Sequence, residues 1–425
     1  MRIAYFVDEF PPFFRGGLGT YAMEITRQFV LLGHEVTVFS HNNGNDPTHD
    51  RWEDVEVHRP LLTDVTPVFS ILNPSDVQEW DIKGQEFYQE TILYNFLSAS
   101  KLVNRLVRGE KRTFEILVAH DWLATIAGIV SQKNLKRPLV IHFHSTEGGR
   151  TANGSFTIKR IEKMAVEKAD LVVTVSYAMR DELIRLGCSE SKIRVIYNGV
   201  DPEKYNPNRF TVREIRQFRE KIGVGDSPMI FFIGRLTWVK GIDMLMHAMP
   251  WILKEVPDAK LVVLGKGEME RKLLDLVGTL DIGNQVILNF SYVGEEERIR
   301  YYAACDVAVF PSRYEPFGIV CTEAMSMGKP VVVGGSGTSG LREQVEIAGS
   351  YPTGYHINPN DPADIATYTV RLLNDAELRR KMGDNGRKRV LSLFTWRRAA
   401  EETIRVYEEA IEKSHGFAED GLAPL

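Results

Sequence analysis

The sequence predicts an α/β protein built from two doubly wound parallel sheets. Short β-branched segments recur along the 425 residues, and stretches with helical periodicity separate them. Most of these segments are apolar almost throughout, which is typical of strands that helices cover on both faces. Six lie before residue 200 and six after it, so we expect two domains and not one very wide sheet.

The expected strands alternate with expected helices. In the first half of the chain the strands are residues 3–7, 35–40, 116–120, 139–144, 171–176 and 193–197. In the second half they are residues 229–233, 260–264, 286–290, 307–310, 330–333 and 354–357. Helical periodicity predicts crossover helices between them, for example at 17–32, 241–255 and 317–327. A last helix is expected from Thr395, which can cap it, to about residue 413.

Length also favours two domains, because one core holds roughly 100–200 residues. The turn-forming run from Asn198 to Pro202 follows an expected strand and precedes a polar stretch. We therefore place the domains at 1–201 and 202–394. Residues 42–110 contain fewer strand patterns and many aromatic side chains, so we expect an elaboration with packing of its own.

Composition argues against several classes of protein. The net charge of −5 does not suit a protein whose main task is to coat nucleic acid. Cys188, Cys305 and Cys321 are too far apart in the sequence to suggest a disulfide framework or a thiolate zinc site. No apolar run approaches the roughly 18 residues that span a bilayer, and the N-terminus does not resemble a signal peptide. A cytoplasmic protein is the default expectation, and nothing in the sequence indicates an oligomeric state.

Three glycine-rich turns each lie between an expected strand and an expected helix. They are Gly16-Gly17-Leu18-Gly19, Gly265-Lys266-Gly267 and the run from Gly335 to Gly340. Backbone N–H groups at a helix N-terminus bind anionic phosphate, and glycine lets such a ligand approach closely. The third turn matches G-x-G-x-x-G, but a dinucleotide fingerprint belongs in the first βα turn. Any single loop is equally well explained as a tight turn, whereas three loops favour a shared ligand crevice.

Four charged residues of the second half strengthen the case for a phosphate ligand. Arg235 directly follows a buried run and Lys240 precedes a helix, so the two cations could neutralise a diphosphate without a metal ion. Glu315 and Glu323 flank the start of a later helix, which would place Glu323 within reach of a ribose. The first N–H groups of that helix would point into the same crevice, and they belong to Gly318, Ile319 and Val320.

Five motifs along the chain together indicate a family: Gly16-Gly17-Leu18, His120-Asp121-Trp122, Asn198-Gly199-Val200-Asp201, Gly234-Arg235 with Lys240, and Glu315-Pro316-Phe317-Gly318 with Glu323. With these motifs the sequence resembles the retaining nucleotide-sugar glycosyltransferases of family four. The two glutamates eight residues apart, combined with the two cations, are the most specific element. The resemblance runs from Met1 to the last helix, and the sequence is similar to glycogen and starch synthases, especially the shorter archaeal-type enzymes.

The resemblance implies a GT-B fold, in which two Rossmann-like domains face each other across a cleft and the last helix, residues 395–425, returns to the first domain. It implies that Arg235 and Lys240 hold the donor diphosphate and stabilise the leaving group, and that Glu315 contacts the donor sugar. Asp121 and His144 would line the sugar and acceptor side. The other residues that it implies for donor binding are Gly17, Leu18, Tyr292, Val293, Phe317, Gly318, Ile319, Val320 and Glu323. Of these, Tyr292 and Val293 are expected to hold the base of the nucleotide.

The implied reaction moves glucose from ADP- or UDP-glucose to an α-glucan acceptor with retention of the anomeric configuration. Neither a metal nor a cofactor is expected, and no two aspartates stand two residues apart, so the DxD signature of metal-dependent transferases is absent. The first loop departs from the glycogen-synthase pattern Lys-x-Gly-Gly-Leu-Ala because Arg15 directly precedes Gly16, which leaves the donor and acceptor open. His142 should share the strand face of His144, where one of the two has a structural role.

Three alternatives remain open. A family-four transferase could move another hexose, such as mannose, to a small molecule or a lipid. The G-x-G-x-x-G match suggests an NAD-dependent dehydrogenase, which would bind NADH. A non-catalytic carbohydrate-binding protein would not need the two cations Arg235 and Lys240.

Overall fold

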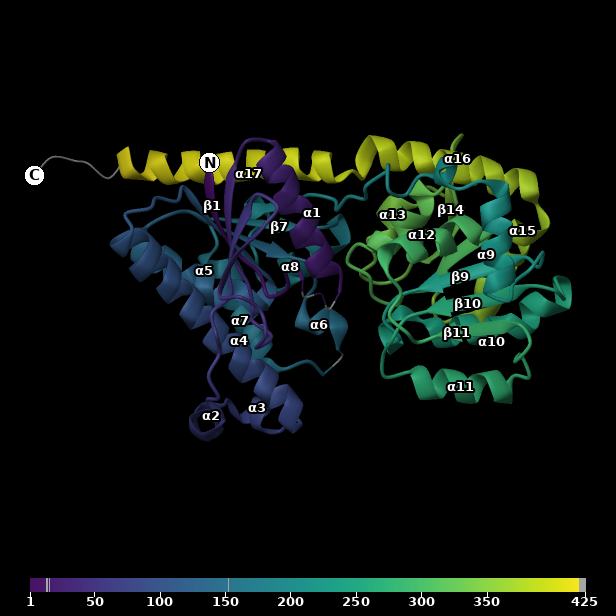
Figure 1. Cartoon of the computed structure of the whole chain (residues 1–425), viewed down its shortest axis with the longest axis horizontal. Helices are drawn as coiled ribbons and strands as arrows, with labels where there is room; N and C mark the ends of the chain where they lie inside the picture. The colour runs from purple at the N-terminus through teal and green to yellow at the C-terminus, as the bar shows by residue number, and fades with distance from the viewer. Residues whose placement is uncertain (13, 15, 152, 420–425) are drawn as a thin grey trace, which may run out of the picture. The chain divides into compact units, whose positions relative to one another are not determined.

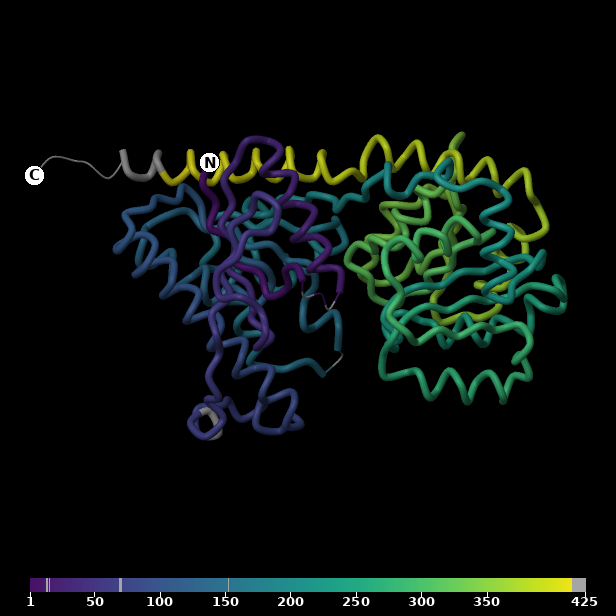
Figure 2. Tube along the Cα trace, in the orientation of Figure 1, coloured from purple at the N-terminus to yellow at the C-terminus, as the bar shows by residue number. Residues whose placement is uncertain are grey.

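The computed structural model describes residues 1–12, 14, 16–151 and 153–419. The chain forms two compact units, of which one contains Met1–Tyr197 together with the segment from Trp396 on, and the other contains Asn198–Thr395. Figure 2 shows the beginning and the end of the chain, purple and yellow, running through the same unit. The expected boundaries at 201/202 and 394/395 differ from these by a few residues. The Val200 N–H donates to the Phe394 carbonyl at 2.9 Å and Val200 pairs with Thr395, which keeps both segments in the second unit.

The first unit contains an eight-stranded sheet with the order β3-β4-β2-β1-β5-β6-β7-β8. Its strands are β1 (Arg2–Phe6), β2 (Glu35–Phe39), β3 (His49–Trp52), β4 (Val55–His58), β5 (Ile116–His120), β6 (Leu139–Phe143), β7 (Leu171–Thr174) and β8 (Ile193–Val195). All neighbouring pairs are parallel except β3 with β4. The central strands are buried throughout, as their continuous apolar pattern predicts.

Helices cover both faces of this sheet (Figure 1). On one face α1 (Gly17–Leu31) packs against α17 (Trp396–Glu419), and on the other α5 (Asp121–Leu135) packs against α4 (Ile82–Ser100) and α7 (Phe156–Lys168). The remaining short elements are α2 (Thr66–Leu72), α3 (Ser75–Gln78), α6 (Glu147–Arg150), α8 (Tyr177–Arg185), the π-helix η1 (Lys101–Gly109) and the 3₁₀ turn η2 (Glu190–Lys192). The C-terminal residues 420–425 of the expected last helix lie outside the described residues.

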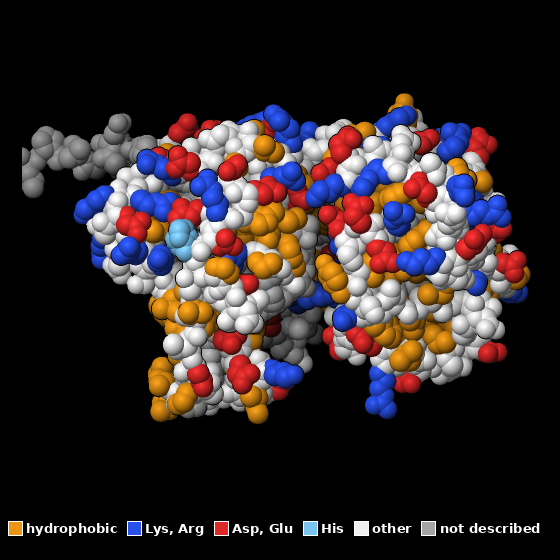
Figure 3. Space-filling model, in the orientation of Figure 1, with side chains coloured by type: hydrophobic (Ala, Val, Ile, Leu, Met, Phe, Trp, Pro, Cys, Tyr) orange, Lys and Arg blue, Asp and Glu red, His pale blue; other side chains and the backbone are white. Residues whose placement is uncertain are grey.

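Residues 42–110 contain two strands, β3 and β4, that the sequence pattern does not predict. Both have four residues, and β3 is an exposed edge strand, so neither has a continuous apolar run. Tyr88 and Ile92 of α4 pack in one cluster with Trp122 of α5 and Ile158 of α7, so this segment is anchored on the helices of the first unit. On the face shown in Figure 3, hydrophobic side chains gather over α2, and acidic and basic side chains are interspersed elsewhere.

The second unit contains a six-stranded sheet with the order β11-β10-β9-β12-β13-β14, and all its neighbouring pairs are parallel. Its strands are β9 (Met229–Ile233), β10 (Lys260–Leu264), β11 (Val286–Asn289), β12 (Val307–Phe310), β13 (Val331–Gly334) and β14 (Gly354–Ile357). Its helices are α9 (Val212–Lys221), α10 (Ile242–Glu255), α11 (Glu270–Thr279), α12 (Glu295–Ala304), α13 (Ile319–Ser326), α14 (Leu341–Gln344), α15 (Pro362–Asn374) and α16 (Ala376–Leu393), with 3₁₀ turns η3 (Pro207–Arg209) and η4 (Trp238–Lys240).

Both sheets are doubly wound, as the sequence predicts. The winding reverses between β1 and β5 in the first unit and between β9 and β12 in the second. The loops that leave these neighbouring strands diverge, so the carboxyl edge at each reversal is where a ligand crevice is expected. Within the described residues, every helix is too short or too polar to span a bilayer.

The contact of α17 with the first unit can be tested at Tyr407, whose side chain is fully buried against Phe29 and whose hydroxyl lies 2.9 Å from His142 Nε2. Tyr407→Phe leaves that buried nitrogen without its partner, so we expect a loss of about 1–3 kcal/mol in the free energy of unfolding, measured by urea denaturation. The exposed Arg405 on the same helix is the control, and Arg405→Ala should change stability by less than about 0.5 kcal/mol. Equal stability of the two variants would contradict the contact.

Candidate functional site

Two loops meet at the carboxyl edge of the second sheet, where the winding reverses. One follows β9 and carries Arg235 and Lys240, and the other follows β12 and carries Glu315. The Arg313 N–H donates to the Val239 carbonyl at 2.8 Å, which joins the loops through their backbones. Gly241 permits this approach, because its φ is +67° and a Cβ there would lie 1.9 Å from the Pro311 carbonyl oxygen.

Lys240 and Glu315 form an ion pair across these loops. Lys240 Nζ lies 2.5 Å from Glu315 Oε2, and the two side chains are only 19% and 10% exposed. Ser312 Oγ donates to the same carboxylate oxygen at 3.3 Å. Two of the predicted site residues, 75 positions apart in the sequence, are therefore in direct contact.

Arg235 is the third charged group at this edge. It lies two residues after the end of the buried strand β9 and is exposed, and no hydrogen bond or ion pair joins its guanidinium to another described residue. Lys240, close to it in sequence, already has a carboxylate partner. The guanidinium of Arg235, unpaired among the described residues, can therefore bind an anion at this edge. Arginine is well suited to phosphate because its donors form a planar fork.

The G-x-G-x-x-G loop holds the backbone of Glu315. The Glu315 N–H donates to the Thr338 carbonyl at 3.1 Å, and the Gly340 N–H donates to the Glu315 carbonyl at 2.8 Å. These two bonds run between loops that follow β12 and β13. The glycine-rich loop thus positions a candidate site residue, which is a role that the pattern alone does not reveal.

Helix α13 begins at Ile319, two residues later than expected. Gly318 has φ +96°, which is incompatible with a helical residue, so Phe317 and Gly318 precede the helix. Phe317 is 3% exposed and packs against Phe394, at 6.0 Å between ring centroids. Ile319 and Val320 occupy the first turn, where backbone N–H groups have no acceptor within the helix.

Glu323 lies deeper, within a group of residues that sequence reasoning missed. Its two carboxylate oxygens accept hydrogen bonds from the hydroxyls of Tyr205 at 2.8 Å and Tyr302 at 2.6 Å, and Arg298 lies 3.6 Å away. The Glu323 carboxylate raises the pKa of Arg298 above its usual range, so the guanidinium stays protonated. A ribose at Glu323 would share a carboxylate that is already hydrogen-bonded.

Tyr292 and Val293, which are expected to hold the base of the nucleotide, follow the edge strand β11. The Tyr292 side chain is 87% exposed and Val293 is half-buried. Their loop follows β11, the edge strand, which β10 separates from β9.

In the first unit, α1 starts at Gly17, and Leu18 follows in its first turn. Glu9 Oε2 accepts hydrogen bonds from the N–H groups of Gly16 at 2.9 Å and Gly19 at 3.3 Å. A carboxylate of the chain itself therefore already binds at this helix N-terminus, where phosphate was expected. Arg15 lies outside the described residues.

Asp121 and His144 lie together at the ends of β5 and β6. Asp121 Oδ1 accepts a hydrogen bond from the His144 backbone N–H at 2.7 Å. Asp121 begins α5 with φ +51°, a left-handed conformation that aspartate and asparagine adopt more readily than most residues. The structure thus joins the two residues expected on the acceptor side.

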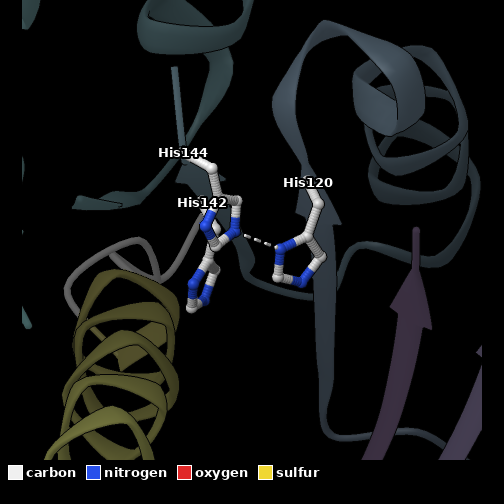
Figure 4. A group of neighbouring side chains, drawn as sticks. All are labelled: His120, His142 and His144. Carbon is white, nitrogen blue, oxygen red and sulfur yellow. Dashed lines mark hydrogen bonds between the residues drawn. The ribbon is translucent and has the colours of Figure 1, made fainter. Parts of the chain in front are cut away.

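His120 and His142 complete a group of three histidines (Figure 4). His120 Nδ1 lies 3.0 Å from His144 Nε2, and the register places His120 opposite His142. His142 and His144 share one face of β6, as alternation predicts, with ring planes 17° apart. Both ring nitrogens of His142 contact tyrosine hydroxyls, Tyr21 at 3.2 Å and Tyr407 at 2.9 Å. His142 therefore has no free nitrogen for a metal ion, and the group fits a hydrogen-bonded assembly better than a metal site.

Burial sets the charge of these groups. It lowers the pKa of His144 to about 3, so the imidazole is neutral at pH 7. It raises the pKa of Asp121 to about 6, although the hydrogen bond from His144 opposes the shift. Nearby Glu162 has its pKa raised to about 8 by burial.

Asp121→Asn should change how stability depends on pH. Because the pKa of Asp121 is about 6 in the folded chain and about 3.9 in an unfolded one, the parent protein loses stability as pH rises from 4 to 6. Asparagine keeps an oxygen for the His144 N–H but cannot ionise. We expect the variant to gain about 3 kcal/mol relative to the parent between pH 4 and pH 7 in urea denaturation. Parallel pH curves would show that Asp121 ionises normally.

Comparisons with known proteins agree with this architecture. The family model described as Glycosyltransferase Family 4 matches residues 15–204, and that described as Glycosyl transferases group 1 matches residues 214–389. An uncharacterised glycosyltransferase of Methanocaldococcus jannaschii is 33% identical over 419 residues, which cover 97% of this chain and 99% of that protein. Glycogen synthase of Mycobacterium tuberculosis is 28% identical over 418 residues, with 96% and 94% covered. A protein of Mycolicibacterium hassiacum named MMP α-(1→4)-mannosyltransferase is 26% identical, with 94% and 96% covered.

Solved structures share the fold. Sucrose-phosphate synthase of Thermosynechococcus elongatus superimposes with a TM-score of 0.78 at 23% identity, covering 97% of this chain and 99% of the other. The catalytic domain of starch synthase IV from Arabidopsis thaliana, bound to ADP and acarbose, gives a TM-score of 0.73 at 16% identity, covering 96% and 99%. The family models, the full-length relative and the shared fold agree, and the chain therefore belongs to the family-4 glycosyltransferases, enzymes of the GT-B fold.

Proposed function

We propose that this glycosyltransferase moves glucose from ADP- or UDP-glucose to an α-glucan and retains the anomeric configuration. The observation that carries the proposal is the set of charges at the reversal point of the second sheet. Arg235 has no carboxylate partner among the described residues, and Lys240 is paired with the buried Glu315. These groups suit a substrate that joins a diphosphate to a sugar, because the cations can bind the phosphates while the carboxylate accepts sugar hydroxyls.

Charge stabilisation then drives the reaction. As the bond from the anomeric carbon to the diphosphate breaks, negative charge grows on the leaving oxygen, and Arg235 and Lys240 stabilise it. The acceptor hydroxyl attacks the anomeric carbon on the same face and gives its proton to the departing phosphate. In metal-dependent transferases a metal ion stabilises the charge of the leaving diphosphate. Here the two cations would do so, and the proposal includes neither a metal nor a cofactor.

Residues of the first unit would serve the sugar and acceptor. A neutral His144 can hydrogen-bond a sugar hydroxyl without adding positive charge near the anomeric carbon, and the low pKa of its ring favours that form. Asp121 holds the His144 backbone in place. Since the His144 Nε2 faces His120, its Nδ1 is the nitrogen left for the substrate.

Glucose and a glucan are proposed because the likeness to the Mycobacterium tuberculosis glycogen synthase covers nearly all of both chains. A second candidate is transfer of mannose to a small molecule or a lipid. The likeness to the mannosyltransferase of Mycolicibacterium hassiacum favours mannose, at slightly lower identity. Both candidates use the same cations and differ in donor and acceptor.

Arg235→Ala should lower kcat by about 10²–10³-fold, because one donor to the leaving group is lost. The side chain is exposed, so thermal unfolding should remain unchanged. Arg271 on α11 is an exposed arginine of the same unit, and Arg271→Ala is the matched control that should retain activity. Turnover of Arg235→Ala within a few-fold of the parent would falsify its role at the diphosphate.

Substrate identity can be tested by product analysis with ADP-glucose, UDP-glucose and GDP-mannose, each with and without a maltooligosaccharide. We expect one of the glucose donors to lengthen the oligosaccharide by α-linked glucose. The linkage and the anomeric configuration of the product can be read by NMR. Transfer from GDP-mannose alone would replace the glucan proposal with the second candidate.

A further inference from the structure

Trp238 is an exposed aromatic residue beside the candidate donor site. It begins the 3₁₀ turn η4, which ends at Lys240, and its side chain is 58% exposed. Large apolar rings at the carboxyl edge of a doubly wound sheet lie where such folds bind ligands. The Trp238 ring is therefore a candidate contact for a ligand at this edge.

A buried arginine fixes the ring in this exposed position. The Arg313 guanidinium lies over the Trp238 ring, 4.7 Å from its centre, and Nη1 donates to the Trp238 carbonyl at 2.5 Å. Arg313 also pairs with Asp243 at 2.9 Å and donates to Asn360 Oδ1 at 2.7 Å. The Arg313 and Asp243 side chains are only 7% and 4% exposed, and such burial of charge is costly. One face of an exposed indole is thus held by an extensive polar network.

The place of Trp238 in the sheet indicates which part of a substrate it would meet. Tyr292, which is expected to hold the base of the nucleotide, follows β11, and β10 lies between β11 and β9. Trp238 follows β9 and contacts Arg313, which follows β12, so it lies at the edge where the winding reverses, and Lys240 and Glu315 follow the same two strands. Glu315, expected at the donor sugar, is 7% exposed, whereas Trp238 is open to solvent. A sugar ring that extends from the site into solvent belongs to the acceptor.

We propose that the open face of Trp238 stacks on a hexose ring of the carbohydrate acceptor, an assignment that rests on the proposed function. The face of an aromatic ring is negative, and a hexopyranose presents C–H groups of partial positive charge on one side. This contact requires an acceptor long enough to reach Trp238. It would therefore make the enzyme prefer oligosaccharides to single sugars.

The test is a kinetic comparison of Trp238→Ala, Trp238→Phe and the control Trp251→Ala. Trp251 lies on α10 of the same unit and is 59% exposed, so it matches Trp238 in type and exposure. We expect Trp238→Ala to raise the KM for a maltooligosaccharide about tenfold and to change the KM for the donor by less than about twofold. Trp238→Phe should recover most of the loss because it retains a ring, and Trp251→Ala should resemble the parent.

Two outcomes would overturn the inference. An unchanged acceptor KM in Trp238→Ala means that the ring does not bind the acceptor, and an increase confined to the donor KM means that it stacks on the nucleoside. The proposed function is judged separately, by whether the parent enzyme lengthens the oligosaccharide at all. If the parent uses another donor and acceptor, the same ratio of variant to parent KM, measured with those substrates, decides the role of Trp238.

Discussion

The candidate donor site depends on a single reversal in the winding of a parallel sheet. Because every strand of the second unit points the same way, all carboxyl ends lie at one edge, and only at β9 and β12 do neighbouring loops diverge. The hydrogen bond between Arg313 and Val239 and the ion pair of Lys240 with Glu315 then join those loops. The contact between Lys240 and Glu315 follows from that arrangement.

The first unit uses the same winding for another purpose. Its reversal lies between β1 and β5, and the register of β5 with β6 sets His120 opposite His142. Strands covered on both faces leave little water at these residues, so burial lowers the pKa of His144 and raises that of Asp121. The reversal in the second unit thus gathers charged groups, whereas in the first unit burial keeps the His144 imidazole neutral at pH 7.

Continuous apolar runs predict twelve of the strands well, because burial on both faces leaves a strong pattern. The exposed hairpin of β3 and β4 leaves no such pattern. Local motifs predict that Arg235, Lys240 and Glu315 share one edge, but not that Lys240 pairs with Glu315. The hydroxyls around Glu323 come from Tyr205 and Tyr302, and Tyr407 reaches His142 across 265 positions. Such contacts depend on tertiary packing, and no local periodicity in a single sequence records them.

The first unit is made of two pieces of chain, and this affects how the protein forms during translation. Residues 1–197 are synthesised before the second unit, whereas α17, which covers Phe29 and His142, is synthesised after it. At about 5–20 residues per second, the roughly 200 residues of the second unit delay that helix by about 10–40 s. During this interval the strands of the first sheet have all been made, but the face that carries α1 still lacks α17. The nascent chain is therefore most prone to aggregate after most of it has been synthesised, and a truncation before Trp396 would make that state permanent.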